Sequence, residues 1–244
     1  GFFDALLAGE MGHETLRVLY GRIAASGPFD GNRVPEYLSW IRPAMDEILP
    51  AFESRHGPFL RPMFEAYMPK LGDRIERLLR EEARAFQGWE VESLEGDLEK
   101  DYPDLEAVLV GRLDRLARRD GEHGIIDYKK RSIPGKDDVR PDVNGYLAAP
   151  QMAAYILLCE AAGRTVSRAR IWSLEDARAL DVVGPGAGTR EDYGPALAAF
   201  EDGLRKTAER LRAGDFRPPR PEERDCGNCD WASICRTGYA TEGR

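Results

Sequence analysis

The sequence predicts an α/β domain whose N-terminal third is helical. Three observations lead to this prediction. Residues 2–24 and a second stretch from Phe64 to Phe86 carry apolar residues at helical spacing. From Trp89 onward the pattern changes to short segments in which apolar and polar residues alternate. Two further helical patterns lie among and after these segments. Helices that flank a cluster of strands are typical of an α/β domain.

The first 88 residues are predicted to be helical. In the first helix His13, Leu16 and Tyr20 fall on or near one face, and the Gly/Pro-rich stretch SGPFDGNRVP then breaks the pattern. The second helical pattern closes at Gly88, a candidate C-cap. This part is followed by a predicted core at residues 89–217 and a cysteine-bearing tail at 218–244.

The predicted core alternates strands with helices. Period-2 patterns predict strands within residues 89–98, 107–117, 124–132 and 166–174. Between the third and the fourth lies a predicted helix that has Pro150 in its first turn and Gly163 at its end. An amphipathic helix is predicted at residues 192–213, and it ends at Gly214.

Composition limits the classes of function. With 244 residues, 42% hydrophobic and 32% charged, the chain is typical of a globular protein. It contains no apolar run of about 18 residues and no signal-peptide pattern, so we expect no membrane partner; its start on Gly1 without a methionine suggests an excised domain. Its four cysteines suggest a reducing compartment, hence a cytoplasmic location. The net charge of −8 argues against a nucleic-acid-binding surface over the whole molecule, but is compatible with a local basic groove.

The stretch from Gly111 to Ser132 is predicted to be a β-hairpin. Its strongest turn signal is the dipeptide Asp120-Gly121, and a two-residue turn there pairs residues whose numbers sum to 241. Leu116 then faces Ile125, an apolar pair that stabilises the ladder. In the same register Asp114 faces Asp127, although like charges opposed across a ladder destabilise it.

A hard cation would explain this opposition of carboxylates. Mg²⁺ and Mn²⁺ take oxygen ligands, often one or two carboxylates together with water and substrate phosphate. Such an ion polarises a phosphodiester and makes hydroxide available near neutral pH. Alternation along the strand places Lys129 on the same side as Asp127, where it could orient the water or stabilise charge on the phosphate. These parts predict a metal-dependent phosphodiesterase.

Asp114, followed by Asp127-x-Lys129 on the second arm of the hairpin, resembles the PD-(D/E)XK nuclease superfamily. Within it, GRLDRL is similar to the Gly-x-x-Asp-Arg version of RecB-type nucleases, QMAAY to their Gln-x-x-x-Tyr motif, and GEMGHETL to the helix that carries their His. The resemblance implies a restriction-endonuclease-like core, in which a mixed sheet is flanked by helices.

The resemblance also implies roles for individual residues. Asp114, Asp127 and Lys129 would be catalytic, and the metal ligands would be Asp114 and Asp127, assisted by His13 and the backbone carbonyl of Tyr128. Without the resemblance, His13 would be read as a buried core histidine. Contacts to DNA would come from the remaining candidates, which are Gln151, Tyr155 and Arg115.

Two points stay open at the level of sequence. An acidic residue of the first strand is expected to enter the site, and either Glu92 or Glu95 could be that residue. Gln151 and Tyr155 could simply form the semi-polar edge of a helix, but one turn apart they are also suited to holding a phosphate or a base.

The tail carries Cys226-x2-Cys229-x5-Cys235, a metal-ligand spacing that suits Zn²⁺ or an iron–sulfur cluster. The fourth cysteine, Cys159, lies on an apolar helix face and is expected to be core. In AddB-like nucleases a Cys upstream of the His-bearing helix completes a [4Fe–4S] cluster. This chain begins after that position, so we expect an incomplete cluster, through truncation or through natural loss.

The resulting hypothesis is the exonuclease domain of a RecB/AddB-type helicase–nuclease that acts in double-strand-break repair and recombination. DNA, a helicase motor and a partner subunit would be its partners. No Gly-rich phosphate loop appears, so ATP should have no direct effect on this chain. One alternative is a free-standing nuclease of the CRISPR spacer-acquisition type. The other is a non-catalytic, metal-stapled domain that binds DNA or a partner.

Overall fold

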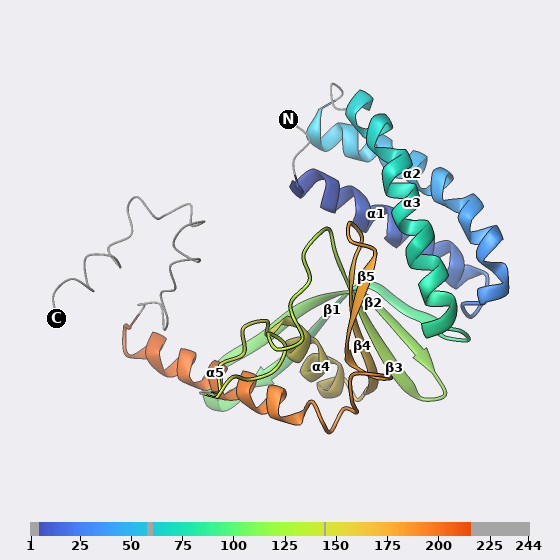
Figure 1. Cartoon of the computed structure of the whole chain (residues 1–244). Coiled ribbons are helices and arrows are strands. Elements are labelled where there is room, and N and C mark those ends of the chain that lie inside the picture. The colour runs from blue at the N-terminus through green and yellow to red at the C-terminus, as the bar shows by residue number, and fades with distance from the viewer. Residues whose placement is uncertain (1–4, 58–60, 144, 216–244) are drawn as a thin grey trace. The chain divides into compact units, whose positions relative to one another are not determined.

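The computed structural model describes residues 5–57, 61–143 and 145–215. It confirms an α/β fold with a helical N-terminal part. The elements of the described residues run in the order α1 (Ala5–Ala25), η1 (Gly31–Arg33), α2 (Val34–His56), α3 (Arg61–Ala85), β1 (Glu90–Tyr102), η3 (Pro103–Leu105), β2 (Ala107–Arg119), β3 (Glu122–Lys129), α4 (Gln151–Ala161), β4 (Thr165–Ser173), β5 (Arg178–Val183) and α5 (Gly194–Arg212) (Figure 1).

The strands form one mixed sheet in the order β1-β2-β3-β4-β5. Strands β3 and β4 are parallel, and α4 lies in the crossover between them, as a parallel pair requires. The other neighbouring strands are antiparallel. Strand β5 was not among the predicted strands. It follows β4 directly and adds an antiparallel edge to the sheet.

The predicted register of the β2–β3 hairpin is confirmed close to the turn, but the ladder stops before the predicted pair of Asp114 and Asp127. Leu116 pairs with Ile125, and the register holds from Arg115 to the turn. Both turn residues have positive φ, 54° at Asp120 and 82° at Gly121, as the mirror-image turn of a two-residue hairpin requires.

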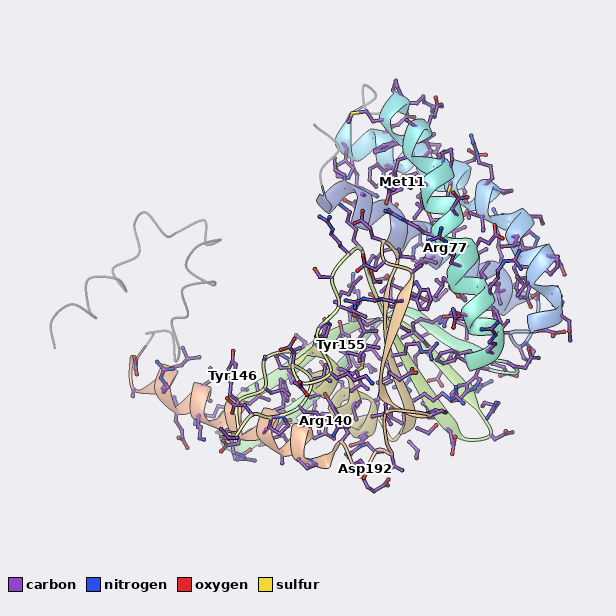
Figure 2. The ribbon with its side chains drawn as sticks, in the orientation of Figure 1. Met11, Arg77, Arg140, Tyr146, Tyr155 and Asp192 are labelled. Atoms are coloured by element: carbon purple, nitrogen blue, oxygen red, sulfur yellow. The ribbon has the colours of Figure 1, made fainter. Side chains whose placement is uncertain are left out.

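Each face of the sheet packs against its own helical layer. Helices α1, α2 and α3 share a core with Ile126, Tyr128 and Trp172, while α4 shares the other core with Leu116 and Ile125. Figure 2 labels Met11 of the first core and Tyr155 of the second. Each fully buried aliphatic side chain contributes about 2 kcal/mol of transfer free energy. The predicted catalytic residues Asp114, Asp127 and Lys129 therefore lie on a sheet that is supported from both sides.

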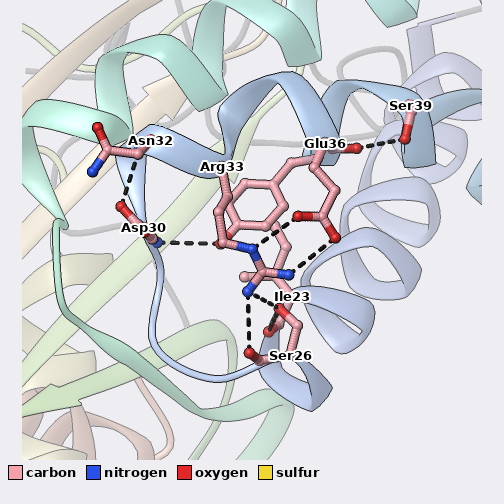
Figure 3. Close-up of polar contacts among 8 residues, drawn as sticks. Ile23, Ser26, Asp30, Asn32, Arg33, Glu36 and Ser39 are labelled. Carbon is pink, nitrogen blue, oxygen red and sulfur yellow. Dashed lines mark hydrogen bonds and ion pairs between the residues drawn. The ribbon is translucent and has the colours of Figure 1, made fainter.

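Helix α2 was not predicted as a separate helix, because Pro43 and Pro50 interrupt its pattern. A polar junction fixes where it begins (Figure 3). The guanidinium of Arg33 donates to both carboxylate oxygens of Glu36 at 2.8 and 3.0 Å and to the carbonyl of Ser26 at 3.1 Å. Asp30 caps the short η1 turn just before it, accepting from the amide of Asn32.

Gly111 of β2 sets how closely α4 approaches the sheet. A Cβ at this position would stand 2.6 Å from Cδ1 of Leu158 and 3.4 Å from Cε1 of Tyr155. A side chain at this position would therefore require the Leu158 side chain to move. The glycine of GRLDRL thus allows the close contact that brings the first residues of α4 near the end of β3.

The helical layer and the sheet belong to one compact unit, which ends at Asp202, and the described residues from Gly203 onward belong to a second. The predicted boundary at residue 88 falls between α3 and β1. Among the described helices, none combines the length and the apolar character that a membrane crossing requires.

Candidate active site

Asp114 is held in place by two neighbouring elements. Its Oδ2 accepts a hydrogen bond of 2.7 Å from the backbone amide of Tyr128 in β3. Its Oδ1 lies 3.5 Å from Nδ1 of His13, which α1 carries to the sheet. The side chain of Asp114 is mostly buried. The carboxylate is therefore oriented before any ligand binds.

Glu95 enters the same site because β1 is irregular. The β1–β2 register shifts between Val91 and Ser93, and after this bulge Leu94 pairs with Arg115 and Gly96 with Leu113. Glu95 therefore stands opposite Asp114. A bulge re-aims the side chains that follow it, and such bulges are frequent next to active sites.

The backbone at Glu95 is left-handed, with φ of 50°, which is uncommon for a residue other than glycine. Such a conformation costs of order 1 kcal/mol and persists where the surroundings hold it. The bend also brings Ser93 close to Gly96, where a Cβ would lie 2.9 Å from the Ser93 Oγ. With this geometry, ligand atoms of His13, Glu95 and Asp114 all lie within 4.8 Å of one another.

Glu92 points elsewhere. Its Oε1 accepts a 2.8 Å hydrogen bond from Nε of Arg164, and its Oε2 lies 3.1 Å from Nε2 of His123. The structure thus decides which glutamate of β1 enters the site. It is Glu95, and no sequence signal marked the bulge that separates the two.

The three ligand-bearing side chains influence one another's charge. Burial raises the pKa of Glu95, and the negative charge of Asp114 raises it further. At His13 burial lowers the pKa, but the hydrogen bond to Asp114 and the charges of Asp114, Glu95 and Asp127 outweigh it, so that the net shift is upward. The site therefore concentrates negative charge and attracts a proton or a cation.

Asp127 lies beside this trio in the interior of β3. Its side chain is 2% exposed, and Lys129 Nζ lies 3.2 Å from Oδ1 and 3.0 Å from Oδ2. Oδ2 is buried and accepts no hydrogen bond, although the ammonium is close to it. Burial raises the pKa of Asp127 to about 6, the charge of Asp114 adds to this rise, and Lys129 opposes it.

Lys129 connects Asp127 to the first turn of α4. Its Nζ donates a 2.6 Å hydrogen bond to Oε1 of Gln151, and Nε2 of Gln151 donates at 2.7 Å to the hydroxyl of Tyr155. Burial raises the pKa of Tyr155 to about 12, so the phenol is neutral near pH 7. The Gln-x-x-x-Tyr pair is a hydrogen-bonded pair one helical turn apart, in contact with the lysine.

The site thus combines the aspartate of one hairpin arm with an Asp-x-Lys on the other. The comparison with protein families supplies the deciding observation: the family described as the PD-(D/E)XK nuclease superfamily matches residues 3–236. The chain belongs to this superfamily. No curated protein matches the chain.

From the sequence, Asp114 is assigned to the first aspartate of the superfamily motif, and Asp127 and Lys129 to its acidic residue and its lysine; these assignments stay predictions. The residues present fit a divalent cation. Two carboxylates and an imidazole form a compact donor set, and the buried Oδ2 of Asp127 next to them accepts no hydrogen bond. Oxygen-rich sets of this kind suit Mg²⁺ and Mn²⁺.

Arg115 does not lie where the sequence analysis expected it. It follows Asp114 along β2 and points to the opposite face, where it is 2% exposed. Both terminal nitrogens donate to the carboxylate of Glu82, at 2.9 and 2.6 Å, and its guanidinium carbon lies 3.9 Å from the ring centre of Tyr20. Alternation along a strand explains the position. This corrects the expectation that Arg115 contacts DNA.

The remaining predicted residues are Tyr128 and the four cysteines. The side chain of Tyr128 is buried in the helical core, stacked on Tyr20 with ring centres 6.2 Å apart. The role of its backbone carbonyl stays a prediction. Cys159 is fully buried and burial raises its pKa to about 12, as expected of a core thiol. Cys226, Cys229 and Cys235 lie outside the described residues.

Proposed function

We propose that this chain is a DNA exonuclease that hydrolyses phosphodiester bonds with Mg²⁺ or Mn²⁺. Membership of the nuclease superfamily supports the reaction class. The observation that carries the proposal is the position of Lys129, whose ammonium lies between the buried carboxylate of Asp127 and the amide of Gln151. A lysine held beside a carboxylate that could bind a metal is suited to phosphodiester hydrolysis, because it can orient the attacking water and stabilise negative charge on the phosphate.

The carboxylates and the histidine would hold the ion. Asp114, Asp127 and Glu95 offer oxygens, His13 offers Nδ1, and the carbonyl of Tyr128 is a further proposed ligand. A divalent ion bound there polarises the phosphodiester and lowers the pKa of a bound water. Before it binds, negative charge dominates the site, which disfavours the approach of a phosphate.

Lys129 would orient the attacking water and stabilise the charge that develops on the phosphate. Two of its contacts, to Asp127 and Gln151, fix the ammonium, and a third N–H is left to donate to water or a phosphate oxygen. Gln151 and Tyr155 would hold the DNA strand. Both side chains can also donate to phosphate or base oxygens.

The finer assignment is a RecB/AddB-type helicase–nuclease in the cytoplasm, with a helicase motor and a partner subunit. The Gln-x-x-x-Tyr pair and the tail cysteines support it at the level of motifs. The Gln151–Tyr155 hydrogen bond supports a functional pair over a semi-polar helix edge. The cysteine triplet would hold a [4Fe–4S] cluster, for which this chain supplies three of the usual four ligands.

The test compares wild type with Asp127→Ala and Lys129→Ala on single- and double-stranded DNA with Mn²⁺. Lys130→Ala is the matched control, because Lys130 is the next residue of the same segment. We expect activity in wild type and Lys130→Ala, loss in the other two, and complete inhibition by EDTA. Degradation of linear but not circular DNA would identify an exonuclease. Equal, EDTA-insensitive activity in all four proteins would refute a metal-dependent nuclease.

A further inference from the structure

A cavity of about 360 Å³ adjoins the site on the α4 side of Lys129. Lys129 and Gln151 line its polar part, and the other lining residues are apolar. They come from the segment before α4, from α4 itself, from β4 and from α5, and include Pro134, Ala149, Met152, Ala154, Ile171 and Phe200.

The cavity is open rather than a packing defect. Gln151 is exposed, and Ala149, Ala154 and Phe200 are only partly buried. Its volume lies within the range of small-molecule sites, which are mostly apolar and carry a few polar groups that fix orientation. A ligand that has a charged end and an apolar body would be complementary to both the polar and the apolar part of the cavity.

A nucleotide has this distribution of chemistry. Its phosphate is anionic, and its base has an apolar π-face that stacks on aromatic and apolar side chains. Nζ of Lys129 and Oε1 of Gln151 lie 2.6 Å apart, so the lysine that faces the scissile phosphate also faces the cavity. We propose that the cavity binds the nucleobase that adjoins the scissile phosphate, next to Phe200. This inference rests on the proposed nuclease function.

The residues that are proposed to bind the ion do not line the cavity. His13, Glu95 and Asp114 are not among its lining residues, so binding of the base and binding of the ion use different side chains. Lys129 and Gln151 line the cavity and are also proposed to act on the substrate phosphate and the DNA strand. Occupancy of the cavity would therefore place the sugar–phosphate that follows the base against Lys129.

The variant that tests the proposal is Ala154→Leu. Leucine favours a helix as well as most residues do, and the added carbons extend into the cavity from a partly buried position. Ala161→Leu is the matched control, at an exposed position of the same helix that is outside the lining. Circular dichroism and thermal melts show that both variants fold.

The first measurement is cleavage of oligonucleotides with Mn²⁺, after the cut position has been mapped with wild type. An abasic site on one or the other side of that bond removes the base. When the removed base is the one that the cavity binds, we expect kcat/KM of wild type and of Ala161→Leu to fall about tenfold. Stacking of one base on an aromatic side chain is worth about 1–3 kcal/mol. Ala154→Leu should cleave the normal substrate about tenfold less well and should not distinguish it from the abasic one.

The second measurement needs no cleavage. The deoxynucleoside of 2-aminopurine, which carries no phosphate, is titrated with protein in EDTA and its fluorescence is followed. Saturable quenching by wild type and Ala161→Leu, at least fivefold weaker in Ala154→Leu, supports the cavity. Equal quenching in all three proteins, or no saturation in any, overturns the inference. Failure of Mn²⁺-dependent cleavage alone would refute the nuclease function and leave this titration to decide the cavity.

Discussion

Nζ of Lys129 lies 2.6 Å from Oε1 of Gln151, so the last residue of β3 is hydrogen-bonded to the first residue of α4. Of the 21 residues between them, those that the structure describes form no strand or helix, yet the two ends of this segment meet at the bond. The position of the ammonium therefore depends on where α4 sits. It follows that residues of the helix can influence chemistry at the strand.

Replacement of Gln151 by Ala should lower activity without removing it. The variant releases one of the two groups that hold Lys129, and we expect kcat for DNA cleavage to fall about tenfold. Lys129→Ala removes the group itself and should cost about 10²–10⁴-fold, in the range of a positioned proton donor or acceptor. Initial rates with saturating Mn²⁺ measure both. A larger loss in Gln151→Ala than in Lys129→Ala would contradict this order.

The two glutamates of β1 should differ in their effect on metal dependence. Glu95→Gln removes one oxygen ligand of the compact donor set, so we expect the Mn²⁺ concentration for half-maximal activity to rise about tenfold or more, the range seen when groups around a metal are replaced. Glu92→Gln is the control, because Glu92 pairs with Arg164 and His123 instead. Its Mn²⁺ requirement should match that of wild type.

The stability of the metal-free protein should depend on the charge of Asp127. Its folded-state pKa of about 6 exceeds the ordinary value of 3.8, so the folded protein favours the protonated carboxyl. That contribution is fully present below pH 3.8 and is lost as the pH rises through 6.

Asp127→Asn stays neutral at every pH and removes this dependence. We expect it to raise the free energy of unfolding in EDTA by about 3 kcal/mol at pH 8, and by only about 0.5 kcal/mol at pH 4. Urea denaturation at both pH values measures the difference between the two proteins. A gain that grows as the pH falls would show that the buried charge is not responsible. Asp127→Asn should also be inactive in DNA cleavage, because its amide lacks the negative charge with which the carboxylate would bind the ion.

Arg115 should matter for stability and not for DNA affinity. Arg115→Ala leaves the buried carboxylate of Glu82 without a charged partner, with only the hydroxyl of Tyr20 still donating to it, and we expect a loss of about 3–5 kcal/mol in the free energy of unfolding. Arg118→Ala breaks the exposed pair with Glu90 and should cost about 0–1 kcal/mol. Urea denaturation and anisotropy of labelled DNA separate the two effects. Weaker DNA binding by folded Arg115→Ala, with unchanged stability, would return Arg115 to the DNA interface.

The cysteine triplet should determine iron content. Protein purified without oxygen should contain iron and absorb near 400 nm, with the three cysteines and one external ligand holding the cluster. Cys229→Ser should abolish both signals, while Cys159→Ser should leave them unchanged because that thiol is buried in α4. Zinc in place of iron would identify a different soft metal at the same ligands.

Local chemistry was enough to predict the hairpin. Asp120-Gly121 accepts the positive φ values of a two-residue turn, and that turn alone fixes the register that brings Leu116 opposite Ile125. The Gln151–Tyr155 pair followed in the same way, since residues four apart share a helix face. Both signals lie within a few residues of chain.

Other features depend on distant parts of the chain. The choice of Glu95 rests on a bulge and a left-handed glutamate that no local residue signals. Helix α2 forms despite its prolines because Tyr37, Ile41 and Phe52 are buried against its neighbours. For Arg115 a signal was available: its neighbour Asp114 was assigned to one face of the strand, so alternation required the other face.

The compact donor set joins three elements that are far apart in sequence. His13 comes from α1, Glu95 from β1 and Asp114 from β2, so an ion that binds all three ties the N-terminal helix to the sheet as a cross-link would. Ions that bind only the folded state raise its stability by mass action. The increase in melting temperature on addition of each ion can therefore rank candidate ions for this protein in the absence of DNA.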